Sequence, residues 1–186
     1  MELGDLTIAR DYDFYGAHPE KKDGRAGWQF RVWAPRARAV SVVGEFNGWD
    51  PAANPMKKRG QDWELFIPGL AQYESYKYAI EGREGQEIWK SDPYAFHAET
   101  RPGTASKLYD ISGYSWKDGH WKPKEVYDRP LNIYEVHLGS WKRRENGDFY
   151  DYRSLADELA PYVKEMGYTH VELLPVTEHP LDDSWG

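Results

Sequence analysis

The sequence predicts a mainly β protein in two parts, a β-sandwich followed by a βαβ unit. Before residue 112, several short strand-like segments are separated by turns, with no helical pattern between them. After residue 130, two apolar segments flank one amphipathic helix. We therefore expect a lead-in at residues 1–24, a sandwich at residues 25–125 and the βαβ unit at residues 126–186.

The sandwich is expected to begin with two strands and a tight corner. Residues 28–32 alternate between apolar and polar side chains, which is typical of a strand with one buried face. Residues 40–43 are rich in β-branched side chains, and the glycines around them allow the chain to turn. The turn after Gly48 would place the Trp49 indole on a loop beside the sheet.

Four further segments complete the predicted sandwich. Residues 63–67 alternate, and residues 75–80 place their tyrosines inward and Lys77 on the opposite face. A glycine-containing turn leads to residues 88–90, which we expect to pair with that strand in antiparallel fashion. Residues 108–111 supply a last short strand.

The segments between these strands are expected to be irregular. Residues 1–24 show no sustained periodicity, so we interpret them as a lead-in that packs locally through its aromatic side chains. Residues 50–60 contain two prolines and are expected to form a loop. The basic run at residues 57–59 is interpreted as a solvated turn, because three charges are too few to dominate binding.

The C-terminal part predicts a strand, a helix and a parallel strand. Residues 131–138 and 171–176 are apolar enough for buried strands, and residues 152–166 have the spacing of one helical face. Gly167 is placed to stop that helix, whereas Pro161 should kink or break it. A (β/α)₈ barrel needs ~250 residues, so such a barrel would only have started within these residues.

Composition narrows the range of partners. The formal net charge is −7, which gives no reason to expect nucleic acid or an anionic membrane as partner. The absence of cysteine excludes disulfides and thiolate metal sites and is compatible with a reducing compartment. No leader-like segment or apolar stretch of ~20 residues is present. We expect a cytoplasmic protein without a cofactor or bound metal.

Several runs of residues resemble a known family. FRVWAPRARAVSVVGEFNGWD, WELFIPG, YKYAI, KSDPYAF and RPGTAS are similar to the glycogen-binding carbohydrate-binding module of 1,4-α-glucan branching enzymes. The tail, from IYEVHLGSW to VELLPVTEHPLDDSWG, resembles the start of the α-amylase-family barrel in those enzymes. The resemblance implies an immunoglobulin-like sandwich followed by an incomplete barrel.

The resemblance also implies an activity. These enzymes of glycogen biosynthesis cleave an α-1,4 glucan bond through a covalent glycosyl-Asp intermediate and form an α-1,6 branch. Their catalytic carboxylates lie on later barrel strands, so we expect no catalytic residue and no catalysis in this chain alone. The alternatives are a stand-alone glucan-targeting module and a structural domain that braces the barrel.

The resemblance further implies a sugar site at Trp49, Lys77 and Trp89. A glucan has apolar C–H faces that match an indole and a rim of hydroxyls that a lysine can hydrogen-bond. Where related modules have an asparagine, this chain offers the hydroxyls of Thr104 and Ser106. Taken singly, each residue also has an ordinary interpretation, namely a cap on the core, a solvated strand residue or a sheet-covering aromatic.

Other reactive side chains favour no chemistry. Glu178, Asp182 and Asp183 share one loop, whereas retaining glycoside chemistry needs carboxyls on opposite sides of a bond, ~5 Å apart. A solvated acidic loop is the better interpretation. His137 and His179 have no metal-ligand spacing around them, so we expect packing or hydrogen-bonding roles for both.

Overall fold

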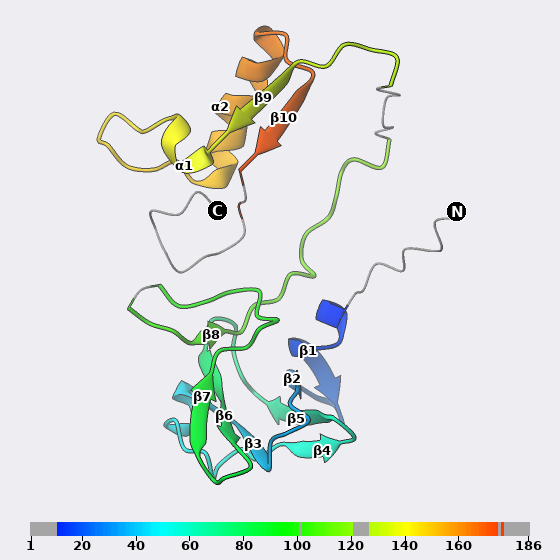
Figure 1. The fold of residues 1–186 in the computed structure, drawn as a ribbon, viewed down its shortest axis with the longest axis vertical. Coiled ribbons are helices and arrows are strands. Elements are labelled where there is room, and N and C mark those ends of the chain that lie inside the picture. The colour runs from blue at the N-terminus through cyan, green and yellow to red at the C-terminus, as the bar shows by residue number, and fades with distance from the viewer. Residues whose placement is uncertain (1–10, 101, 121–126, 175, 177–186) are drawn as a thin grey trace. The chain divides into compact units, whose positions relative to one another are not determined.

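The computed structural model describes residues 11–100, 102–120, 127–174 and 176 (Figure 1). The chain divides into two compact units, one ending at Ser115 and the other beginning at Trp116. The domain bounds expected from the sequence, 1–24, 25–125 and 126–186, stay a prediction. Within the described residues, no helix is long and apolar enough to span a membrane.

The first unit is a sandwich of two antiparallel sheets, as predicted (Figure 1). In the first sheet the strand order is β1-β2-β5-β4, and in the second β6 pairs with β3, β7 and β8. The first sheet contains β1 (Gly16–Lys22), β2 (Arg25–Trp33), β5 (Asp62–Pro68) and β4 (Lys57–Arg59). The second contains β3 (Ala39–Gly44), β6 (Ser75–Glu81), β7 (Glu87–Lys90) and β8 (Ser106–Lys107).

The core lies between the sheets and is formed by the side chains that alternation places inward. Leu65 and Ile80 are partly buried against it. The residues predicted to face inward that are buried in this core are Trp28, Phe30, Val32, Trp63, Ile67, Tyr76 and Tyr78. Period-two burial was therefore sufficient to orient β2, β5 and β6.

The first strand was missed in the sequence. β1 lies where an irregular lead-in was expected and pairs with β2 from Gly16 opposite Arg31 to Lys22 opposite Arg25. Asp23 and Gly24 form the intervening two-residue turn with positive φ angles of 51° and 78°, the conformation that favours tight hairpins. Backbone pairing at the sheet edge specifies β1, so its side chains need no alternation.

Two other expectations were wrong in detail. The basic run forms edge strand β4, in which all three residues are exposed, rather than a turn. Its position is explained by contacts to β5, since Arg59 Nε lies 2.9 Å from Glu64 Oε1 and the Lys58 ammonium lies over the Trp63 ring. The last strand is β8 and not residues 108–111, although Leu108 is fully buried in the core.

The second unit is a βαβ arrangement, as predicted. β9 (Ile133–Val136) pairs in parallel with β10 (His170–Leu173), and α1 (Leu138–Trp141) and α2 (Tyr152–Glu165) lie between them in the sequence. The strands were expected to be buried, but only Val136 is buried among their residues. Two strands and their helix do not provide enough partners to cover both faces of a sheet.

Helix α2 differs from expectation at Pro161. The helix begins at an Asp151 cap, whose Oδ1 accepts a hydrogen bond from the Ser154 N–H at 2.9 Å. It ends before Gly167, whose φ of 77° suits a left-handed terminus. Pro161 lies inside it without a break. The carbonyl that loses its helical partner belongs to exposed Asp157, where water can replace the bond.

Candidate functional site

The corner after β3 is built around the side chain of Asn47. Its Oδ1 accepts a hydrogen bond from Gly44 N, and its Nδ2 donates to the Val42 carbonyl and to Asn54 Oδ1 at 3.0 and 2.7 Å. A Cβ on Gly44 would come within 2.4 Å of the Ser75 carbonyl oxygen, so only glycine fits there. The corner is therefore fixed by side-chain bonds to the backbone and by close packing.

This corner ends in a residue with an unusual backbone. Trp49 has a φ of 62°, directly after Gly48 with a φ of 63°, and its N–H donates to the Gly44 carbonyl at 2.9 Å. For a non-glycine residue the left-handed conformation costs about 1–2 kcal/mol. The surrounding hydrogen bonds hold Trp49 in this conformation, which sets the direction of its indole.

The indoles of Trp49 and Trp89 stack on each other. Their ring centroids are 6.0 Å apart and their planes differ by 17°. Trp89 is 39% exposed, Trp49 is half-buried, and neither belongs to the hydrophobic core. The Trp89 Nε1–H donates to Glu87 Oε1 at 2.7 Å, which fixes the ring and engages its polar atom. The pair forms an aromatic surface accessible from solvent.

Lys77 lies on the same sheet face as this aromatic surface. Trp89 pairs with Ala79, and Lys77 is two residues before Ala79 on β6, so their side chains point to the same side. The Lys77 Nζ donates to Thr104 Oγ1 at 2.7 Å, and both groups are exposed. The Ser91 hydroxyl donates to the Thr104 carbonyl, which ties this loop to the end of β7. Polar hydrogen-bonding groups thus lie on the sheet face that carries the indole pair.

Ser106 has a different environment from the other four predicted site residues. Its side chain is buried, 2% exposed, and its hydroxyl accepts the Asp92 N–H at 2.9 Å. The carboxylate of Asp92 accepts the hydroxyls of Tyr76 and Tyr78 at 2.7 and 3.0 Å and the N–H of Tyr94 at 2.9 Å. The Ser106 hydroxyl therefore serves the interior of the sandwich.

This buried network around Asp92 was not predicted from the sequence. Burial raises the pKa of Asp92, although hydrogen bonds from Tyr76, Tyr94 and Tyr78 oppose that rise. Burial and the nearby carboxylate also raise the pKa of both tyrosines. Two tyrosines at alternate positions on one strand place both hydroxyls on the core side, and each requires an acceptor there. That requirement is the signal that could have identified Asp92.

The described residues contain no cluster of three or more side chains that could hold a metal. His137 Nδ1 lies 2.8 Å from Ser140 Oγ, in keeping with a hydrogen-bonding role. Glu178, His179, Asp182 and Asp183 lie outside the described residues. The arrangement can therefore bind a ligand through an aromatic surface and its neighbouring hydroxyl and ammonium groups.

The sandwich matches a known family of modules. Residues 14–95, which carry the indole pair of Trp49 and Trp89, match the family described as Carbohydrate-binding module 48 (Isoamylase N-terminal domain). The sandwich is therefore similar to carbohydrate-binding modules of that family.

The wider chain resembles branching enzymes over nearly its whole length, which confirms the resemblance seen in the motifs. It is 54% identical over 182 residues to the 1,4-alpha-glucan branching enzyme GlgB of Nitrosospira multiformis, covering 94% of this chain and 24% of that enzyme. With the enzyme of the same name from Geobacillus stearothermophilus it is 50% identical over 186 residues, covering 97% of this chain and 29% of that enzyme. The chain thus spans about a quarter of the length of these curated relatives.

Solved structures support the same fold. A putative alpha amylase from Salmonella typhimurium matches with a TM-score of 0.67 at 23% identity, covering 92% of this chain and 26% of that one. The catalytic module of SpuA, a glycogen-degrading pneumococcal virulence factor, matches with a TM-score of 0.65 at 22% identity, covering 89% and 27%. At these identities the likeness concerns the fold alone.

Proposed function

We propose that this chain is the α-glucan-binding part of a 1,4-α-glucan branching enzyme of glycogen biosynthesis. The observation that carries the proposal is the solvent-accessible stack of Trp49 and Trp89 on the sheet face that also carries the linked pair Lys77 and Thr104. An indole surface matches the C–H faces of glucose rings, and the ammonium and hydroxyl groups match their hydroxyls. The similarity to branching enzymes supplies the choice of an α-glucan.

The proposal assigns no catalytic role to these residues. The activity of the curated relatives belongs to chains about four times longer than this one, and the expected catalytic carboxylates come from later barrel strands. We propose that the chain alone forms no α-1,6 branches. Cytoplasmic location and the absence of nucleic-acid and membrane partners remain predictions.

A calorimetric titration with maltoheptaose tests the sugar site. Trp49→Ala and Trp89→Ala each remove one indole of the aromatic surface. If a bound sugar buries ~80 Å² of apolar area on each indole, at ~25 cal/mol per Å², each variant loses about 2 kcal/mol of binding free energy. That loss corresponds to a roughly 30-fold lower affinity for maltoheptaose. Trp33→Ala is the matched control, because Trp33 is also exposed, hydrogen-bonds to Gln61 and lies on the other sheet. Its affinity should equal that of the parent chain.

A structural role for the sandwich makes the opposite prediction. If the module only braces a barrel, the double variant of Trp49 and Trp89 and the parent chain will bind maltoheptaose equally weakly. A stand-alone targeting protein would bind as proposed, but its gene would not continue in frame into further barrel strands. Sequencing the DNA beyond codon 186 separates that alternative from the proposal.

A further inference from the structure

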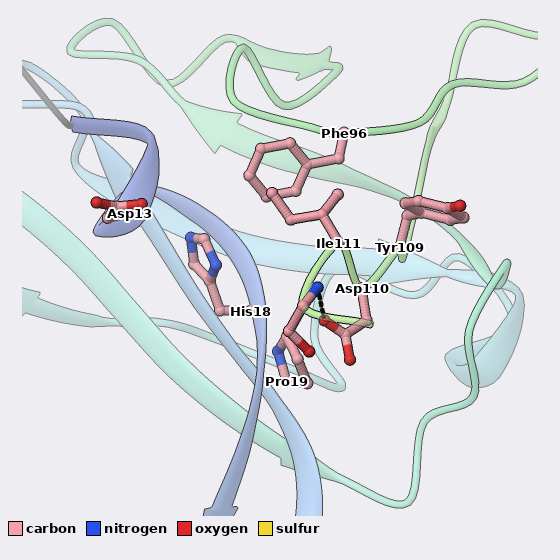
Figure 2. A pocket seen from close by; sticks show the side chains of 8 residues that line it. Asp13, His18, Pro19, Phe96, Tyr109, Asp110 and Ile111 are labelled. Carbon is pink, nitrogen blue, oxygen red and sulfur yellow. Dashed lines mark hydrogen bonds between the residues drawn. The ribbon is translucent and has the colours of Figure 1, made fainter. Parts of the chain in front are cut away.

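The sandwich unit has a cavity of about 250 Å³ whose lining includes none of the residues of the indole site (Figure 2). Strand β1 contributes His18 and Pro19, and Phe96 lies across from them. The segment after β8 contributes residues 109–112, and Asp13 completes the lining. The cavity therefore lies between an edge strand of one sheet and the chain that leaves the other.

The walls of this cavity are held in place by contacts behind them. Phe96 meets the His18 ring edge to face at 5.9 Å, and His18 Nε2 donates to the Tyr15 carbonyl at 2.8 Å. Tyr109 packs against Tyr73 and His97, with ring centroids 5.7 and 5.5 Å away. A ligand would meet aromatic walls that need little ordering on binding.

One carboxylate of the cavity is also oriented. Asp110 Oδ1 accepts the Ser112 N–H at 2.8 Å, shown as the dashed line in Figure 2, and the Asp110 N–H donates to Gln72 Oε1 at 3.2 Å. Hydrogen bonds from the backbone and hydroxyl of Ser112 lower the pKa of Asp110, so the group is ionised at neutral pH. A fixed carboxylate can accept strong hydrogen bonds from adjacent hydroxyls of a sugar ring.

We propose that this cavity is a second α-glucan contact of the module, which takes a single sugar ring of a chain. Its volume is below the ~300–1,000 Å³ of typical small-molecule pockets, so a short segment fits better than a long one. Phe96 and Ile111 suit the C–H faces, and Asp110 suits the hydroxyls. The inference rests on the proposed function, because the proposed function supplies the kind of sugar.

An organic cation is the competing ligand, since Asp13 and Asp110 are both acidic. An ammonium is compact and strongly hydrated, and it gains little from the aliphatic walls formed by Pro19 and Ile111. A neutral ring with two C–H faces uses those walls as well as the carboxylate. The sugar therefore accounts for more of the lining than the cation does.

Amide spectra of the ¹⁵N-labelled 186-residue chain, titrated with maltotriose, test the inference. We expect the amides of Asp110 and Ser112 to shift together with the indole N–H of Trp89. In the Trp49→Ala, Trp89→Ala double variant the shifts at Asp110 and Ser112 should persist. Asp110→Asn keeps an oxygen that can accept the Ser112 N–H. It should lower the maltotriose affinity measured from the Asp110 and Ser112 amide shifts at least tenfold, while the response of the Trp89 indole stays the same. As a control, Asp23→Asn removes one negative charge from the β1–β2 turn, which does not line the cavity, and should change neither response.

Three results would overturn the inference. Shifts confined to the Trp49 and Trp89 surface would remove the second contact and leave the proposed function intact. No shift at either place would remove both. A response of Asp110 and Ser112 to ethylammonium chloride that equals or exceeds their response to maltotriose would replace the sugar by a cation.

Discussion

The buried carboxylate of Asp92 gives the sharpest test of how the sandwich is held together. Tyr76 and Tyr78 are each 1% exposed, and both donate their hydroxyls to Asp92. In Asp92→Ala both hydroxyls lose their acceptor, at roughly 1–3 kcal/mol for each buried unsatisfied group. Removal of a buried charge returns part of that cost. We expect a net loss of about 2–4 kcal/mol.

The measurement should report on the sandwich alone, because the chain has two units. Native-state hydrogen exchange of the β6 amides does this, and a loss of 2–4 kcal/mol corresponds to roughly 30- to 900-fold faster exchange of the slowest amides. The triple variant with Asp92→Ala, Tyr76→Phe and Tyr78→Phe leaves no orphaned hydroxyl. It should therefore recover to within about 1–2 kcal/mol of the parent chain.

Two outcomes would refute this reasoning. If Asp92→Ala lowers the free energy of unfolding of the sandwich by less than about 1 kcal/mol, the hydroxyls of Tyr76 and Tyr78 find other hydrogen-bond acceptors at little cost. A triple variant no more stable than the single variant would mean that Asp92 acts through something other than the tyrosine hydroxyls. The parent chain with Tyr76→Phe and Tyr78→Phe alone completes the cycle.

Three further predictions concern pH, the corner and the helix. Burial raises the pKa of Asp92 above 3.8 in the folded chain, so its contribution to the stability of the sandwich is complete below that pH and declines as the pH rises through the folded pKa. Asp92→Asn should remove this decline in the stability measured by hydrogen exchange of the β6 amides. An unchanged dependence of that stability on pH would contradict the link to Asp92. Gly44→Ala should destabilise the sandwich by about 2–4 kcal/mol and weaken maltoheptaose binding, because its methyl group would meet the Ser75 carbonyl; unchanged thermal unfolding would disprove the close fit. Pro161→Ala should slow hydrogen exchange in α2 by restoring a backbone donor, worth roughly 1–3 kcal/mol, whereas faster exchange would show that the proline stabilises the helix.

The central strands were predictable because burial on one face leaves a period of two in the sequence. β2, β5 and β6 followed from that pattern. β7 is an edge strand with all four residues exposed, and it followed from the glycine-containing turn before it. β1 was not predictable in this way, because an edge strand can be specified by backbone bonds to its neighbour. The prediction that Pro161 would kink or break the helix was wrong for a related reason. The free-energy cost of a proline in a helix depends on whether water can hydrogen-bond the carbonyl that loses its helical partner.

The sequence predicted which side of the sheet some candidate side chains occupy, but not the geometry that relates them, and the sugar site itself stays a prediction. Alternation placed Lys77 away from the core, and the glycine corner placed Trp49 on a loop. The stacking of Trp49 on Trp89 depends on a left-handed backbone conformation at Trp49. The sequence does not indicate this conformation, because tryptophan rarely adopts it. The burial of Ser106 likewise depends on its bond to Asp92, which is distant in the sequence.

The cationic edge of the first sheet has a consequence for crowding. An edge strand has unpaired backbone groups along its outer side, so it can pair with the edge strand of another molecule and start aggregation. Along β4 the chain presents Lys57, Lys58 and Arg59, all exposed. If two copies bound the same polysaccharide, pairing of their β4 edges would bring like charges together. This repulsion would disfavour edge-to-edge pairing of the sheets even at a high local concentration on the polymer.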